Sequence, residues 1–421
     1  MSINIWHPFT QHGLGEPIPE IARAEGASLY QADGARIIDA ISSWWVQTHG
    51  HCHPKIVAAI QDQSARLDQM IFAGWTHEPA RELAVGLSNF LPDSLEHIFF
   101  SDSGSTAVEV ALKMALGYWH NRGEARQKIL VMEHSYHGDT VGAMSVGSRG
   151  VFNQAYEPLL FDVGTISFPE AGAEQKTLDQ LEAYCKDRQN PPAALIVEPL
   201  ILGAGGMKIY SPAILTQMAA ICRAHDVLFI ADEVMTGWGR TGTVFACEQA
   251  DVEPDILCLA KGLTGGVIPL AVTAATHAIY QAHFSKDRAQ MFFHSSSFTA
   301  NPIACAAANA NLAIWREEPV QDRIDGIIAC HSGFSDRLKQ KSNISGLRQC
   351  GTILALEIDD GAGDYMSDLG PMLLAFFRDR NILLRPLGNT IYVMPPYCIT
   401  LEELASIYRV IEEAIDYFGN S

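Results

Sequence analysis

The chain has 421 residues, of which 48% are hydrophobic and 18% are charged. This length predicts two or three domains at roughly 150 residues each, and the composition predicts a globular protein with a large core. Lysine and arginine number 29, aspartate and glutamate number 48, and the formal net charge is −19. This acidity argues against nucleic acid or an anionic membrane as a partner, whereas an anionic small molecule needs only one or two local cations.

The chain shows no targeting or membrane-spanning pattern. Residues 1–8 lack a basic stretch followed by an apolar one, so we expect no signal peptide. Uninterrupted apolar runs such as residues 193–197 are far shorter than the ~20 residues of a membrane span. The nine cysteines are scattered singly from Cys52 to Cys398, which favours reduced thiols over a disulfide framework. We therefore expect a cytoplasmic protein.

The middle of the chain alternates short apolar runs with helical ones. The expected strands are residues 98–100, 128–132, 195–197, 227–231, 255–259 and 270–273, and the expected helices include residues 106–119 and 212–225. Continuous apolar strands that alternate with helices predict an α/β domain with a mostly parallel central sheet covered on both faces. We assign this large domain to residues 51–300.

The pattern changes after Asn301-Pro302. An alanine-rich helix is expected over residues 303–315, followed by mixed helices and strands that end in a helix near residues 401–417. We expect a smaller α+β domain over residues 301–421, joined by an N-terminal segment of residues 1–50. In such parallel sheets, ligands bind beyond the carboxyl ends of the strands, where the candidate motifs mostly fall.

The strongest chemical signal is a pair of charged residues that end buried strands, Asp232 and Lys261. An aspartate there can keep a heteroaromatic nitrogen protonated, and a lysine can form a Schiff base with an aldehyde. Together they supply the protein's half of pyridoxal phosphate chemistry. The alternative is that Lys261 extends its amine to the surface and Asp232 caps a helix.

A phosphate site is expected in the segment 101–106, which joins a strand to a helix. Its backbone N–H groups and hydroxyls can receive a phosphate at the helix N-terminus, although an ordinary serine or threonine cap with Glu109 in the early turns explains the same residues. Tyr136 follows a strand, so its ring could stack on a cofactor, and a core or cap tyrosine is the alternative.

Two further motifs do not carry the function. Residues 237–242 match G-x-G-x-x-G, but they open no obvious helix, and the dinucleotide fingerprint requires one. His49, His51 and His53 resemble a metal cluster but lack the spacing of a zinc module, so a turn before Pro54 is the better explanation and no metal site is expected.

Several of these segments resemble the class III (omega) aminotransferase family. Asp232-Glu233-Val234, the glycine-rich segment 236–242 and Lys261 look like the signature of the class. The further segments 6–11, 42–45, 50–54, 138–140, 203–207 and 392–397 are similar to the branch of the class that acts in biotin biosynthesis. The resemblance runs from about Trp6 to Tyr397, which is essentially the whole chain.

The resemblance implies fold type I of the pyridoxal phosphate-dependent transferases and an obligate homodimer with shared active sites. It implies that Lys261 binds the cofactor covalently and acts as general base, and that Asp232 pairs with the pyridine nitrogen. Gly104 and Ser105 are implied to bind the cofactor phosphate, and Ser296 and Ser297 belong to a loop that is implied to reach the partner subunit's phosphate. Tyr136 is implied to stack on the cofactor ring, with Val234 beneath the ring. The resemblance counts Tyr136 with Lys261 and Asp232 among the catalytic residues.

For the substrates, the resemblance implies transamination of 7-keto-8-aminononanoate to 7,8-diaminononanoate, with S-adenosylmethionine as amino donor. The implied pocket consists of Phe9, Trp44, Tyr136, Lys261, Ser295 and Arg385, and Arg385 would hold the substrate carboxylate. The chain departs from the family at two places: Phe9 replaces a tyrosine whose hydroxyl contacts substrate, and Ser295-Ser296-Ser297 replaces Gly-Pro-Thr.

Two rival functions stay open at this point. One is another class III omega-aminotransferase that uses a diamine, lysine or an omega-amino acid as donor; the paired tryptophans Trp44 and Trp45 and the segment 6–8 argue against it. The other is a non-catalytic binding module of the same fold, which the complete set of chemical groups argues against. A nicotinamide-dependent dehydrogenase would rest only on the glycines of residues 237–242.

Overall fold

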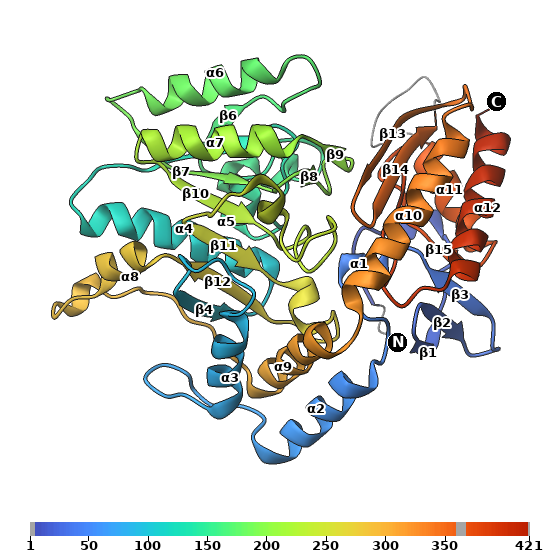
Figure 1. Cartoon of the computed structure of the whole chain (residues 1–421), viewed down its shortest axis with the longest axis horizontal. Helices are drawn as coiled ribbons and strands as arrows, with labels where there is room; N and C mark the ends of the chain where they lie inside the picture. The colour runs from blue at the N-terminus through green and yellow to red at the C-terminus, as the bar shows by residue number, and fades with distance from the viewer. Residues whose placement is uncertain (1–4, 359–367, 420–421) are drawn as a thin grey trace.

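A seven-stranded sheet forms the centre of the larger part of the molecule. The computed structural model describes residues 5–358 and 368–419. The strand order is β4-β12-β11-β10-β7-β5-β6, and in Figure 1 it runs from β4 beside α3 to β6 beside α6. The strands are β4 (His97–Ser101), β12 (Ala271–Ala275), β11 (Ile256–Leu259), β10 (Leu228–Asp232), β7 (Pro192–Val197), β5 (Lys128–Met132) and β6 (Gly164–Ile166). The mostly parallel sheet is confirmed, with β12 antiparallel to both neighbours.

Helices cover both faces of this sheet because its strands are apolar on both sides. In β5, Ile129 and Val131 pack in one apolar cluster with α4 (Gly104–Asn121) and α8 (His277–His283). The alternate residues Leu130 and Met132 pack in the other cluster, with α6 (Glu174–Cys185) and α7 (Pro212–Ala224). This alternation follows from the two-residue period of a strand.

The smaller part of the molecule lies on the right in Figure 1. It contains an antiparallel sheet with the order β13-β14-β16 and the helices α10, α11 and α12. It also contains a four-stranded sheet with the order β1-β2-β3-β15. The second sheet joins the N-terminal segment to the C-terminal part, because β15 pairs parallel to β3. These elements are β1 (Ile21–Glu25), β2 (Ser28–Gln31), β3 (Arg36–Asp39), α10 (Val320–Leu338), β13 (Ile344–Cys350), β14 (Ile353–Ile358), α11 (Leu369–Arg378), β15 (Ile382–Leu383), β16 (Thr390–Val393) and α12 (Leu401–Phe418).

Of the remaining elements, three longer helices pack together and the others are short. Helix α9 (Pro302–Glu317) packs against α2 (Pro54–Arg66) and α3 (Glu78–Leu87), so it contacts the larger part although it follows residue 301. The division of the chain at residues 50 and 300 stays a prediction. The short elements are η1 (His12–Leu14), α1 (Ser42–Trp45), α5 (Val141–Ser145), η2 (Gln154–Leu159), β8 (Ile201–Leu202), β9 (Lys208–Ile209), η3 (Ala246–Ala250), η4 (Lys261–Thr264) and η5 (Arg288–Gln290).

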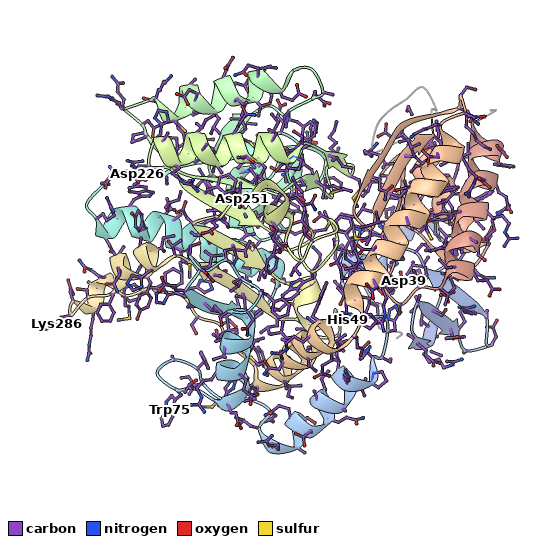
Figure 2. The ribbon with its side chains drawn as sticks, viewed as in Figure 1. Asp39, His49, Trp75, Asp226, Asp251 and Lys286 are labelled. Carbon is purple, nitrogen blue, oxygen red and sulfur yellow. The ribbon has the colours of Figure 1, made fainter. Side chains whose placement is uncertain are left out.

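Asp39 holds α1 in an unusual backbone conformation. Its buried carboxylate accepts hydrogen bonds from the N–H groups of Ile41 and Ser43, and it lies 2.8 Å from His51 Nε2. Ser43 has φ 60° and Trp45 has φ 66°, values that non-glycine residues rarely adopt. Asp39 and His49, labelled in Figure 2, lie near the boundary between the two parts. The carboxylate therefore fixes the segment that carries Trp44 and Trp45.

Local capping explains where two of the predicted helices begin. The Ser103 side chain caps α4 in a capping box with Thr106, and Thr400 caps α12 in the same way with Glu403. The predicted helices 106–119 and 401–417 are therefore confirmed, and α4 begins two residues earlier than predicted. Within residues 5–358 and 368–419, no helix is both long and apolar enough to cross a bilayer.

Candidate active site

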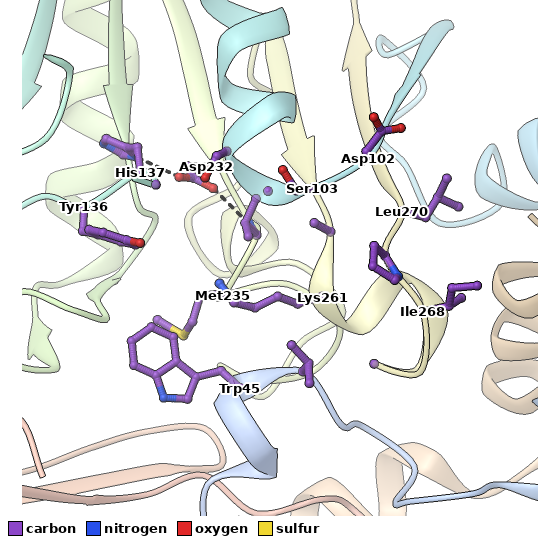
Figure 3. Close-up of a pocket in the computed structure, with 18 of the residues that line it drawn as sticks. Trp45, Asp102, Ser103, Tyr136, His137, Asp232, Met235, Lys261, Ile268 and Leu270 are labelled. Carbon is purple, nitrogen blue, oxygen red and sulfur yellow. Dashed lines mark hydrogen bonds and ion pairs between the residues drawn. The ribbon is translucent and has the colours of Figure 1, made fainter. Parts of the chain in front are cut away.

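A cavity of about 330 Å³ lies at the carboxyl ends of the parallel strands, with one wall formed by α1. Residues that follow five strands line it, which is the position that a ligand takes in such sheets. The lining residues are Trp45, Val46, Asp102, Ser103, Gly104, Ser105, Tyr136, His137, Gly138, Glu198, Asp232, Val234, Met235, Ala260, Lys261, Gly266, Val267, Ile268, Pro269 and Leu270, many of which appear in Figure 3.

Asp232 is the last residue of β10 and is 4% exposed. Its Oδ2 lies 2.7 Å from His137 Nδ1, and its Oδ1 accepts the N–H of Val234 at 3.1 Å, as the dashed lines in Figure 3 mark. Because a carboxylate only accepts hydrogen bonds, the proton between Asp232 and His137 belongs to the imidazole. The buried carboxylate is therefore held in one orientation by two donors.

Lys261 begins η4 directly after β11, and its side chain reaches the space between Asp232 and Trp45 (Figure 3). Burial lowers the pKa of the Lys261 amine, and the nearby carboxylates of Asp232 and Glu198 partly offset this effect. The Nζ atom lies 5.4 Å from the centre of the Trp45 ring. A lowered pKa increases the fraction of neutral amine, which is the form that attacks a carbonyl carbon and accepts a proton. The φ of Lys261 is 44°, a strained value of the kind that clusters at functional sites.

The N-terminus of α4 forms an anion cradle on one side of the cavity. The first N–H groups of a helix have no acceptor within it, and Gly104 and Ser105 are the first two residues of α4. A Cβ atom on Gly104 would lie 2.6 Å from Val234 Cγ1, and one on Gly138 would lie 2.1 Å from Ser105 Oγ. A side chain at either glycine would therefore collide with a residue of the cavity wall, so both positions allow α4, Val234 and the segment after Tyr136 to approach one another closely.

Tyr136 lies beside the cavity opposite Lys261, with its ring directed inward (Figure 3). Its hydroxyl donates to Asp139 Oδ1 at 2.9 Å, and burial raises its pKa well above the ordinary value. The ring is therefore a neutral aromatic face at physiological pH. Its backbone N–H donates to Glu198 Oε1 at 3.0 Å.

The predicted substrate residues Phe9, Trp44 and Arg385 contact one another outside the cavity lining. The Arg385 guanidinium lies 5.9 Å from the centre of the Phe9 ring and 5.5 Å from that of Trp44. The Phe9 ring also meets Trp44 and Phe152 edge-on, at centroid distances of 5.6 and 6.1 Å. This aromatic cluster (Phe9, Trp44 and Phe152) connects to the cavity through Trp45, the neighbour of Trp44 that lines it.

The predicted loop Ser295–Ser297 reaches the edge of the cavity in this single chain without lining it. The Ser296 hydroxyl donates to the carboxylate of Asp102, which does line the cavity. The Ser295 hydroxyl donates to the carbonyl of Ser296 at 3.2 Å, and the Ser297 carbonyl accepts from the Gln69 amide. The roles predicted for Ser295, Ser296 and Ser297 stay predictions.

The two motifs that the sequence set aside have other partners. In residues 237–242, Arg240 is buried and donates to the carbonyls of Pro395 and Gln47 at 3.1 and 2.9 Å. That segment opens no helix before η3. The three histidines diverge to separate partners: His49 lies 2.8 Å from Asn311, His51 2.8 Å from Asp39, and His53 3.4 Å from Glu318.

Three residues near the site were missing from the sequence-based prediction. Glu198 follows the apolar run 192–197, so it carries the same signal as Asp232: a charged residue at the end of a buried strand. His137 follows Tyr136 and could have been proposed as a partner of the aspartate. Phe152 lies in a segment without a motif, and no sequence signal marks it.

The fold and the cavity agree with the comparisons to known proteins. The family described as aminotransferase class-III matches residues 11–415, and the chain belongs to this family. Class III aminotransferases depend on pyridoxal phosphate, so the protein is a pyridoxal phosphate-dependent transaminase of fold type I. The cavity fits this cofactor, since it places a buried lysine, a buried carboxylate, an aromatic ring and an anion cradle around one space.

Among relatives, the chain is 45% identical to the adenosylmethionine-8-amino-7-oxononanoate aminotransferase of Synechococcus elongatus, over 98% of both chains. It is 34% identical to the enzyme of the same name from Aquifex aeolicus, over 97% of this chain and 95% of that one. The crystal structure of the Methanocaldococcus jannaschii enzyme of this name superposes with a TM-score of 0.93 at 33% identity, covering 98% of this chain and 97% of that one. An amine transaminase from an uncultivated Pseudomonas species, in its pyridoxal phosphate-bound form, gives 0.92 at 29% identity, covering 99% of each chain.

Proposed function

We propose that the protein transfers an amino group to 8-amino-7-oxononanoate (7-keto-8-aminononanoate), forming 7,8-diaminononanoate in biotin biosynthesis, with S-adenosylmethionine as amino donor. Full-length identity of up to 45% to relatives that carry this substrate in their name supports the proposal. The structural observation that carries it is Arg385 packed against the adjoining rings of Phe9 and Trp44, the latter being the sequence neighbour of Trp45 in the cavity lining. This arrangement suits an apolar chain that ends in a carboxylate.

In this proposal each wall of the cavity has a separate task toward the cofactor. Gly104 and Ser105 would bind its phosphate at the helix N-terminus, and Tyr136 and Val234 would contact its ring. Asp232, oriented by His137, pairs with the protonated pyridine nitrogen. Bound pyridoxal phosphate withdraws electrons from the amino-bearing carbon of the substrate and so makes the proton on that carbon acidic.

Lys261 holds the cofactor between reactions and moves the proton during them. Its amine has a lowered pKa because it is buried, so a neutral amine is available to accept the proton from the substrate carbon. Trp45 and Met235 line the space around it and limit the access of water. In this proposal the amino donor and the keto acceptor react one after the other in the same cavity, as ping-pong kinetics requires.

The aromatic cluster and Arg385 distinguish the substrates. A guanidinium can contact a carboxylate at two points, so Arg385 binds the carboxylate of the keto acid. The rings of Phe9 and Trp44 are 49% and 42% exposed, which leaves apolar surface for the hydrocarbon chain. The same ring faces can attract the sulfonium of S-adenosylmethionine.

We also propose a cytoplasmic homodimer with shared active sites. Exposed aromatic residues flank the serine loop: Phe293 is 63% and Phe298 61% exposed. A partner subunit would cover these rings and receive Ser296 and Ser297 near its own phosphate site. All nine cysteines are free thiols, which is consistent with a reducing compartment.

The second candidate is a class III omega-aminotransferase that uses lysine, a diamine or an omega-amino acid as donor. The observation in its favour is Phe9, which offers no hydroxyl to a polar donor. The close fold similarity to an amine transaminase is compatible with it.

A direct test is to convert 8-amino-7-oxononanoate with purified holoenzyme and each donor separately. The proposal predicts that S-adenosylmethionine converts the cofactor to its amino form and supports formation of 7,8-diaminononanoate, measured by mass spectrometry. Lysine or a diamine as the sole productive donor would favour the second candidate. No diaminononanoate with any donor would contradict the proposed acceptor.

Asp232→Asn tests the pyridine partner. Loss of the negative charge should lower the transamination rate by roughly 100-fold or more, as removal of preorganised electrostatic groups does, with a smaller loss of cofactor affinity. The matched control is Asp255→Asn. The Asp255 carboxylate also bonds to a residue of β10, since it accepts the N–H of Phe229 at 2.7 Å, but Asp255 does not line the cavity. A normal rate per bound cofactor in Asp232→Asn would make this residue structural.

Arg385→Ala tests the carboxylate partner. The loss of a charge-assisted contact should lower kcat/KM for the keto acid by roughly ten- to a hundredfold, and Arg385→Lys should recover only part of it. A simple amine without a carboxylate should react almost unchanged in single-turnover measurements.

The matched control for Arg385 is Arg380→Ala, because Arg380 also lies over an aromatic ring, that of Phe376 at 3.4 Å, and its partners Phe376 and Glu413 are not predicted substrate residues. That variant should keep full activity. Equal losses for keto acid and simple amine in Arg385→Ala would mean that Arg385 supports the fold or the cofactor.

A further inference from the structure

Glu198 is a buried carboxylate in the cavity wall that the proposed mechanism does not use. It follows β7 directly and is 4% exposed. Oε1 accepts the backbone N–H of Tyr136 and Oε2 accepts that of Gly203, both at 3.0 Å. One side chain therefore joins the loop after β5 to the turn after β8.

The first bonded segment lines the cavity, and the second packs behind residues that line it. The first carries Tyr136, whose ring faces the cavity. The second is tightly packed against two lining residues, since a Cβ atom on Gly203 would lie 2.9 Å from Met235 Cε and 3.2 Å from the Trp45 ring. A displacement of Glu198 would therefore disturb both the Tyr136 loop and the Gly203 turn that packs against Met235 and Trp45.

We propose that Glu198 is a positioning residue of the active site, whose carboxylate fixes the Tyr136 loop and the Gly203 turn at the spacing that the cofactor requires. Two hydrogen bonds to one carboxylate are directional and stronger than neutral ones, so they hold both segments closely. Glu198 acts through these segments and transfers no proton to substrate.

The charges around Glu198 make this role sensitive to pH. Burial raises the pKa of Glu198 to about 7, the nearby Asp232 carboxylate adds to the effect, and His137 and the two N–H donors oppose it. The other titratable groups that face Glu198 are Lys261, Tyr136 and Tyr210. The Tyr210 hydroxyl donates to the backbone carbonyl of Glu198 at 2.8 Å. Ionisation near neutral pH therefore strengthens the two hydrogen bonds as the pH rises.

The chain offers a matched control in Glu233. This carboxylate is also fully buried, its pKa is also raised to about 7 by burial, and it also accepts two backbone N–H groups, those of Ala246 and Cys247 at 3.0 and 2.8 Å. Glu233 does not line the cavity. Substitution at both positions thus removes a buried carboxylate with two backbone donors, once from a side chain that lines the cavity and once from a side chain that does not.

The experiment compares Glu198→Gln with Glu233→Gln as dimeric holoenzyme and after removal of the cofactor. Glutamine keeps the length but places an amide N–H against one backbone N–H. We expect Glu198→Gln to bind added pyridoxal phosphate roughly tenfold more weakly. It should also lose the gain in affinity that the wild type shows between pH 6 and pH 8. Glu233→Gln should lower the melting temperature but keep the wild-type cofactor affinity and its pH dependence.

Glu198→Asp provides a second variant, since it keeps the charge but is too short to reach both donors. It should also bind the cofactor weakly, because position and not charge alone is required. Two outcomes would show that Glu198 is structural and that the inference is wrong. In the first, Glu198→Gln and Glu198→Asp bind the cofactor as the wild type does and differ from it only in melting temperature. In the second, neither of these variants folds although Glu233→Gln does.

This inference rests on the proposed function only in taking the cavity to be the site of that reaction. Cofactor affinity and its pH dependence are measured without any substrate. A wild type that binds cofactor but forms no diaminononanoate would contradict the proposed function and leave the comparison of Glu198 with Glu233 intact.

Discussion

The site depends on keeping an amine and a carboxylate buried at the carboxyl ends of two adjacent parallel strands. Asp232 ends β10 and Lys261 follows β11, and these strands pair in parallel register. Burial of charge is costly unless it is paired or hydrogen-bonded, so the surrounding residues compensate for it. His137 and the Val234 N–H satisfy Asp232, while the lowered pKa of Lys261 reduces the charge to be buried.

The smaller part of the molecule completes the site from the other side. Asp39 at the end of β3 fixes α1, and α1 supplies Trp45 to the cavity and Trp44 to the aromatic cluster. Arg385 follows β15, which pairs with β3. Phe9, Trp44 and Arg385, which are proposed to recognise substrate, therefore come from the two ends of the chain, whereas Phe152 and the residues proposed to bind cofactor come from the middle. Changes in the terminal segments could alter substrate choice without altering the cofactor site.

Local patterns in the sequence predict six of the seven strands of the large sheet, all but the three-residue β6, and place Asp232 and Lys261 at strand ends. A charged residue that ends an apolar strand is visible in one sequence, and strand adjacency brings such residues together. Glu198 carries the same signal at the end of β7, but a buried carboxylate alone does not indicate a cofactor role. The contact of His137 with Asp232 and of Phe152 with Phe9 depends on loop paths, which are set by long-range packing. The antiparallel direction of β12 also follows from connections that periodicity does not encode.

The most direct test of this account is to locate the covalent bond between protein and cofactor. The holoenzyme is reduced with borohydride, digested with a protease, and the modified peptide is identified by mass spectrometry. The account predicts a single phosphopyridoxyl group on Lys261, the buried lysine of the cavity with a lowered pKa. Attachment to any other lysine, or no attachment in protein that carries bound cofactor, would contradict it.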